Sequence, residues 1–192
     1  MKTVMTTTTK RKTTKSKPIP DLPTNAFMHE ILELASKQRS NAKKVEVLQK
    51  NDCLPLKTIL IWNFDETVRS LLPEGEVPYG NLKEEVTASG NLSDKIRASG
   101  QSNNSIAEES QRAKKTSIRK EAEKFYNFVQ GGNPSLSSIR REVMFINILE
   151  GLHPEEAEIL VLVKDKKLST KYKISLENVK EAYPDIQWGG RS

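Results

Sequence analysis

Apolar side chains recur at intervals of three and four residues along most of the chain, which is the pattern of amphipathic helices. The pattern starts after Pro23, with Thr24 or Asn25 as a predicted helix cap. The first predicted helix has five apolar residues on one face: Phe27, Met28, Ile31, Leu32 and Ala35. Ser40 or Asn41 begins a second, short helix that passes through Val45 and Leu48.

A third helix is predicted to open with Leu54 and Pro55, because proline is tolerated in a first helical turn. Its apolar residues lie nearly all round, so we expect this helix to be central. They are Leu56, Ile59, Leu60, Trp62 and Phe64. Residues 73–80 contain two prolines and two glycines, which indicates an ordered turn with Val77 and Tyr79 docked on the core.

The second half of the chain predicts further helices. A long one runs from Ile118 to Val129 and stops at a glycine pair. Asn133 is the predicted cap of the next, and its apolar stripe is expected to be core: Leu136, Ile139, Val143, Ile146 and Leu149. Pro154 opens another helix, and Ser175 caps the last. Strand patterns are few, so the sequence predicts an all-α protein, a compact bundle of six or seven helices.

Composition divides the chain into distinct parts. The first twenty residues hold six of the 31 basic residues and none of the 25 acidic ones, so the remainder is neutral. We expect residues 1–23 to be a disordered basic tail, since it has too little apolar surface to fold. Residues 88–112, rich in Ser, Asn and Gly, predict a flexible insertion within one helical domain at 24–187. Residues 188–192 are a predicted C-terminal tail. The tail cations expected to bind phosphate are Lys10, Arg11, Lys12, Lys15 and Lys17.

The chain offers little material for catalysis. His29 and His153 are the only imidazoles and Cys53 the only thiol, and we expect structural roles for all three. No phosphate-binding glycine loop is present. The sequence therefore predicts a non-catalytic protein without cofactor or metal. No apolar run reaches the roughly 18 residues that span a bilayer, so no membrane contact is expected.

Two groups of lysines suit phosphate. The first lies around the loop between the second and third predicted helices: Lys43, Lys44, Lys50 and Lys57. The second flanks Ser169 and Thr170: Lys164, Lys166, Lys167, Lys171 and Lys173. A Lys, Ser and Thr loop before a helix start offers backbone N–H groups beside cations, which fits phosphate oxygens. The alternative is that each group is an ordinary solvated surface.

Several strings carry a resemblance to known families. The segments ILELASKQRSNAKKVEVLQKNDCLPLKTIL, SIRREVMFINILEGL and VKDKKLSTKYKISLENVKEAYPDI resemble the N-terminal helical DNA-binding domain of ATP-dependent DNA ligases. Together with LLPEGEVPYG and FYNFVQGGNPSL, they also resemble a family of small proteins of large tailed phages, over most of residues 25–186. The ligase resemblance implies contact with duplex DNA across the minor groove through Lys50, Asn51 and residues 164–171. The Lys-x-Asp-Gly adenylation motif of ligases is absent.

These observations predict a non-catalytic, phage-encoded protein that binds duplex DNA through phosphate and minor-groove contacts. The tail would add affinity that falls with salt. The alternative is an interaction or virion-assembly factor that docks on a phage or host protein and uses the tail as a tether, and the neutral body favours this hypothesis. The expected location is the host cytoplasm or the virion.

Overall fold

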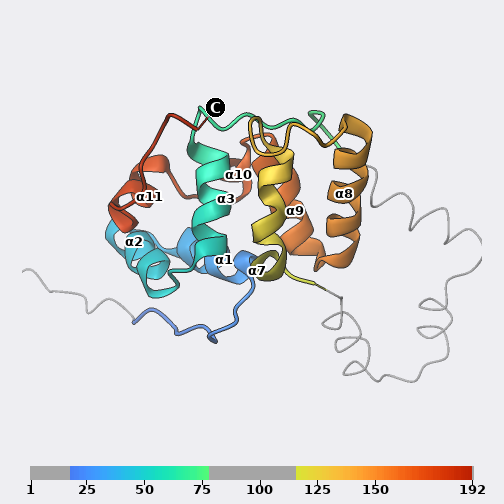
Figure 1. The fold of residues 1–192 in the computed structure, drawn as a ribbon. Coiled ribbons are helices and arrows are strands. Elements are labelled where there is room, and N and C mark those ends of the chain that lie inside the picture. The colour runs from blue at the N-terminus through green and yellow to red at the C-terminus, as the bar shows by residue number, and fades with distance from the viewer. Residues whose placement is uncertain (1–17, 78–115, 192) are drawn as a thin grey trace, which may run out of the picture.

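A computed structural model of the protein describes residues 18–77 and 116–191. Within these ranges the chain forms eight α-helices and one 3₁₀ helix around a common hydrophobic core (Figure 1). The all-α fold is therefore confirmed. The basic tail up to residue 17, Tyr79 of the predicted turn and the predicted insertion at 88–112 lie outside the described residues.

The first three helices follow the predicted order: α1 (Met28–Lys37), α2 (Asn41–Lys50) and α3 (Leu54–Phe64). The side chain of Ser40 accepts a hydrogen bond from the N–H of Lys43 and caps α2, as predicted. The predicted cap of α1 is wrong, since Thr24 and Asn25 form a turn and the helix begins after Phe27. α3 lies at the centre of the fold, with α9 and the 3₁₀ helix packed against it (Figure 1).

The predicted long helix after residue 117 is a short α-helical turn, α7 (Ile118–Glu121), followed by the 3₁₀ helix η1 (Ala122–Phe128). A 3₁₀ helix has three residues per turn, so residues i and i+3 share one face. This places Phe125 and Phe128 on the same side, with ring centroids 5.8 and 6.2 Å from that of Trp62. Packing of two rings on one indole accounts for the tighter helix.

The remaining helices are α8 (Ser138–Gly151), α9 (Pro154–Lys164), α10 (Leu168–Lys171) and α11 (Leu176–Ala182). The predicted start of α8 at Asn133 is wrong, because Ser137 caps the helix and accepts from the N–H of Arg140. Asn133 instead donates its side-chain amide to the carbonyl oxygen of the Asn127 side chain, 2.8 Å away. α7 and α10 are single turns of four residues, too short to leave a periodic pattern in the sequence.

The apolar stripe predicted for α8 is only partly buried: Leu149 lies in the core as predicted, but the earlier part of the stripe does not. Ile139 is 74% exposed and Val143 is 52% exposed, whereas Arg141 and Phe145 are buried. The guanidinium of Arg141 donates to three backbone carbonyls of the preceding turn, at Asn127, Asn133 and Leu136. These hydrogen bonds hold the Arg141 side of α8 inward, and Ile139 and Val143 of the predicted stripe face solvent.

Charged side chains anchor both ends of α9 in the interior. Glu156 is fully buried, and its two carboxylate oxygens accept the N–H of Met28 at 3.0 Å and of Ile118 at 2.9 Å. Burial raises the pKa of Glu156 in spite of these hydrogen bonds. At the other end, the ammonium of Lys164 donates to the carbonyls of Pro73 and Gly75, each at 2.8 Å. α9 therefore fixes α1, α7 and the 73–75 turn in place.

The described residues of both predicted tails contact the body. Ile19 and Leu22 pack against the core, so the described part of the N-terminal tail is bound to the body. At the C-terminal end Trp188 packs against the core, and the buried carboxylate of Asp65 accepts from Gly189 and Arg191. Val77 packs on the core as predicted. None of the described helices combines the length and the apolar character needed to cross a lipid bilayer.

Candidate nucleic-acid interface

α2 and α11 lie side by side and run in the same direction (Figure 1). Near their starts, the ammonium of Lys44 donates to the carbonyl of Lys173 at 2.5 Å. Near their ends, the Tyr183 hydroxyl donates to the carbonyl of Leu48 at 2.6 Å. The segment before α11 is thereby held against the first turn of α2, so two predicted lysine groups meet there.

We call this meeting point the basic corner, and it has five residues: Lys37, Arg39, Lys43, Lys44 and Lys173. It joins three segments, since the N–H of Lys173 also donates to the Ser36 hydroxyl at 2.9 Å at the end of α1. Among the described residues, no carboxylate lies within salt-bridge distance of Arg39, Lys44 or Lys173. These side chains keep a positive charge that other charges of the body do not pair.

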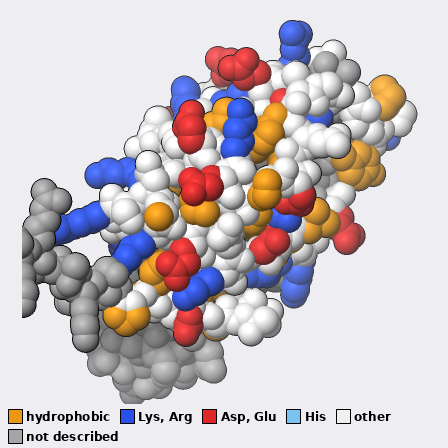
Figure 2. All heavy atoms as spheres, turned by 90° about the vertical axis from the view of Figure 1, so that its left-hand side faces the viewer, with side chains coloured by type: hydrophobic (Ala, Val, Ile, Leu, Met, Phe, Trp, Pro, Cys, Tyr) orange, Lys and Arg blue, Asp and Glu red, His pale blue; other side chains and the backbone are white. Residues whose placement is uncertain are grey.

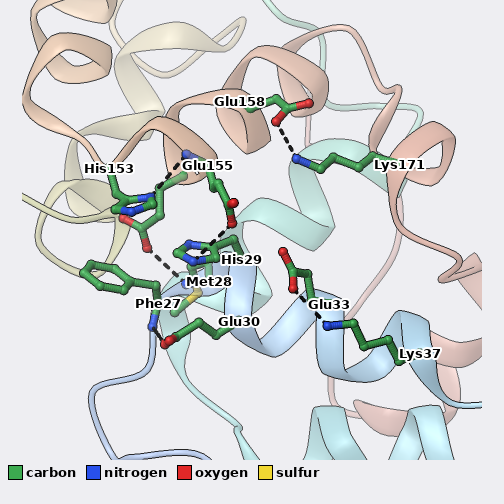
Figure 3. Close-up of polar contacts among 11 residues, drawn as sticks. Phe27, Met28, His29, Glu30, Glu33, Lys37, His153, Glu155, Glu158 and Lys171 are labelled. Carbon is green, nitrogen blue, oxygen red and sulfur yellow. Dashed lines mark hydrogen bonds and ion pairs between the residues drawn. The ribbon is translucent and has the colours of Figure 1, made fainter. Parts of the chain in front are cut away.

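Carboxylates border the corner on the α9 side (Figure 3). Glu33 pairs with Lys37 at 3.3 Å, and Glu158 pairs with Lys171. Lys171 also lies over the ring of Tyr172, 5.6 Å from its centroid. Lys171, a predicted phosphate contact, is therefore held against its own protein and lies outside the corner.

The predicted site residues Lys50, Asn51 and Lys57 lie at the other end of α2. Lys50 pairs with Glu46 at 3.3 Å, and Lys57 pairs with Asp52 at 3.2 Å and Asp185 at 3.1 Å. The hydrogen bond to Asp185 raises the pKa of Lys57. Asn51 donates its side-chain amide to the carbonyl of Val47 at 2.8 Å. The structure does not bring this group to the basic corner.

The prediction that Lys164 contacts phosphate requires a correction. Its side chain is only 1% exposed, and its ammonium donates to Asp165 as well as to the 73–75 turn. A side chain with all its donors used in the interior cannot reach a phosphate. The sequence pattern missed this because the carboxylate and carbonyls that hold Lys164 come mostly from a distant turn.

Lys166 and Lys167 are exposed, as predicted. Lys166 has a left-handed backbone, with φ at 57°, and its ammonium donates to the backbone carbonyl of Asp65. Burial lowers the pKa of Lys166. Lys167 is the residue directly before α10.

The loop before α10 does not present free donors as the sequence suggests. The N–H of Leu168 donates to the side-chain oxygen of Asn63 at 3.0 Å. The hydroxyl of Ser169 donates to the carbonyl of Ile174, and that of Thr170 to the carbonyl of Lys167. Because these donors serve the fold, the predicted capture of phosphate by Ser169 and Thr170 needs correction.

The face that carries α2 and α11 has a mixed charge distribution. Figure 2 shows Lys and Arg side chains interspersed with Asp and Glu over this face. A continuous positive surface of the kind that covers many nucleic-acid-binding domains is not present there. Any phosphate contact by this face is therefore local. Within the basic corner, Arg39, Lys44 and Lys173 have no carboxylate partner among the described residues.

Both histidines pack together away from the corner (Figure 3). The rings of Phe27, His29 and His153 contact one another, with centroid separations of 5.5 Å for Phe27–His29, 4.9 Å for His29–His153 and 5.6 Å for Phe27–His153. His29 also pairs with Glu155 at 3.3 Å, and His153 caps α9 by accepting the N–H of Glu155. Among the described residues, no group of three or more His, Cys, Asp or Glu side chains is arranged to hold a metal ion.

Sequence reasoning missed Lys37 and Arg39. The signal was present, because four cations fall between residues 37 and 44 without an acidic residue among them. Lys37 and Arg39 fall at the end of the first predicted helix, whereas Lys43 and Lys44 fall at the start of the second. The sequence alone therefore did not indicate that these four residues form one group.

Comparison with known proteins gives one match. The model of a family described as "Family of unknown function (DUF6433)" matches residues 31–98 and 98–170. These two stretches include α2 and α9 in full and the described helices between them. No curated protein and no solved structure is similar enough to match.

Proposed function

The chain belongs to the DUF6433 family, and we propose that it binds duplex DNA through phosphate contacts of the basic corner without catalysing a reaction. The supporting observation is the contact between the Lys44 ammonium and the Lys173 carbonyl, which joins cations of α2 and of the α10–α11 segment. Cations that come from separate segments and lack carboxylate partners are well placed to neutralise neighbouring phosphates.

The proposed contact is to the DNA backbone, without a preference for base sequence. Phosphate contacts position a protein on DNA, whereas base-edge contacts carry sequence information. The minor-groove contact implied by the ligase resemblance involves Lys50, Asn51 and residues 164–171, which lie outside the basic corner, so it is not part of this proposal. The basic tail, outside the described residues, would add further cations to the complex.

The test is duplex binding by the full chain, followed by fluorescence anisotropy over a salt series. The variant Lys44→Glu with Lys173→Glu should bind DNA at least tenfold more weakly. The slope of log affinity against log salt should also fall by about two, at roughly 0.9 per lost phosphate contact.

The matched control is Arg69→Glu with Lys120→Glu, which changes the net charge equally at two exposed residues on other elements. The control should keep the salt slope of the unmodified protein. If both variants lose affinity to the same extent, binding follows net charge and the basic corner has no specific role. Circular dichroism of each variant verifies that the helices are retained.

A second candidate function is docking on another phage or host protein. Tyr126 is 54% exposed beside a cavity of 290 Å³ that is lined mainly by apolar and aromatic side chains, Trp62 and Phe125 among them. Exposed aromatic residues next to such cavities are typical anchors of protein interfaces. If this candidate is correct, a defined protein should copurify with the chain and stay bound after nuclease treatment. The variant Tyr126→Glu should abolish this binding.

A further inference from the structure

α8 has two apolar faces, and the fold uses only one of them. Phe145 and Leu149 face the core, while Ile139 and Val143 are exposed to solvent. Ile146, which is half-buried, continues the outer stripe at helical spacing. A stripe that reads as core in the sequence but faces water in the structure is typical of a helix that packs against a second molecule.

A groove runs beside this stripe. It has a volume of 500 Å³ and lies between α8 and the α7–η1 segment. Residues of α8 and of the α7–η1 segment form its walls: Thr116, Glu121, Lys124, Ile139, Arg140, Val143, Met144, Asn147 and Ile148. The exposed apolar stripe of α8 forms a ridge, and this ridge and the groove lie next to each other on one surface.

We propose that this surface binds a second copy of the chain, with the two α8 helices antiparallel. A twofold interface pairs a surface with itself, so the Ile139 and Val143 ridge of each copy would enter the groove of the other. In this arrangement Val143 of one copy lies near Ile146 of the partner copy. Ile139 then comes to lie near the opposite end of the partner helix. The proposal is independent of DNA binding.

Charge complementarity favours a second copy over other occupants. Arg140 lies near the start of α8, and Glu150 is exposed near its end. Antiparallel pairing brings each Arg140 close to Glu150 of the partner copy and places opposite ends of the two helix dipoles side by side. The chain has no net charge outside its first twenty residues, so the bodies of two copies can approach without general electrostatic repulsion.

The experiment is sedimentation equilibrium of the full chain without nucleic acid. The apparent mass should rise above the monomer value of 21.7 kDa with concentration. The variant Ile139→Asp with Val143→Asp should weaken association more than about tenfold, since these residues form the centre of the interface.

Two further variants make the result specific. Leu54→Asp changes an equally exposed apolar residue, 71% exposed at the start of α3, and should leave association unchanged. Arg140→Glu should weaken association, and combining it with Glu150→Arg should restore it. A chain that stays monomeric at every concentration would overturn the proposal. Association that Ile139→Asp with Val143→Asp does not weaken would overturn it as well.

Discussion

The C-terminal end of α9 and the basic corner both contain lysines, and they use them in opposite ways. The side chain of Lys164 is 1% exposed and satisfies two backbone carbonyls and one carboxylate. Lys44 and Lys173 lie at the surface, and no carboxylate of the described residues pairs with them. The same residue type therefore stabilises the fold in one region and carries charge without a carboxylate partner among the described residues in the other.

The difference is physical. A buried ammonium must replace its lost hydration by good hydrogen bonds, and removing such a group leaves polar partners unsatisfied. An exposed ammonium is already hydrated, so removing it costs the fold little. Substitutions in the interior anchors should consequently change stability, while substitutions in the basic corner should change binding.

The largest effect is expected at the other end of α9, for Glu156→Gln. An amide offers one acceptor where the carboxylate offers two, so the N–H of Met28 or of Ile118 would lose its partner in the core. We expect the free energy of unfolding to fall by about 3 kcal/mol. Urea unfolding followed by circular dichroism measures it.

Glu158→Gln is the matched control, because Glu158 is on the same helix but exposed, in a pair with Lys171. Its unfolding free energy should stay within about 0.5 kcal/mol of the original. Equal losses in the two variants would mean that burial of Glu156 does not distinguish it from a surface carboxylate.

A somewhat smaller loss, about 2 kcal/mol, is expected for Lys164→Met. Methionine fills a similar volume but leaves the carbonyls of Pro73 and Gly75 without their donor. The exposed neighbour Lys167 gives the contrast, since Lys167→Met should change stability by less than about 0.5 kcal/mol. If Lys164→Met is neutral in urea unfolding, α9 does not hold the 73–75 turn in the way described.

The sequence predicted the class of fold well because the core helices follow simple periodic rules. α2 and α3 start where Ser40 and Pro55 indicate, and both are governed by local chemistry. The errors arise where distant contacts decide. Hydrogen bonds from Arg141 bury its side of α8 and leave Ile139 and Val143 exposed, and Phe125 and Phe128 both contact the Trp62 ring from the 3₁₀ helix at 122–128.

The candidate site was less predictable than the fold. A lysine cluster in a sequence does not state which members are buried, and Lys164 differs from Lys167 only through contacts with a turn about 90 residues away. The basic corner itself needs the parallel packing of α2 and α11, which no local pattern encodes. Clusters of charged residues could be found from the sequence, but the carbonyls and carboxylates that they contact in the fold could not.

Asp65 combines features of the interior anchors and of the surface charges. Its carboxylate is buried, but it holds a segment that lies at the surface. Burial by itself would raise the pKa of Asp65, but hydrogen bonds from Gly189 and Thr67 and the charge of Arg191 lower it below the ordinary value of 3.8. A lowered pKa means that the contribution to stability is complete above 3.8 and is lost as the pH falls through the lower folded value.

The smallest effect therefore depends on pH. Asp65→Asn should lower the free energy of unfolding by about 1 kcal/mol at neutral pH, because the amide keeps the shape but loses the charge that these donors favour. The gap between the two proteins should narrow in strong acid, where Asp65 is itself protonated. Urea unfolding at several pH values measures the gap. If the difference in unfolding free energy stays constant with pH, the carboxylate charge has no part in holding residues 189–191 at the end of α3. Burial alone would then distinguish the interior anchors from the surface charges.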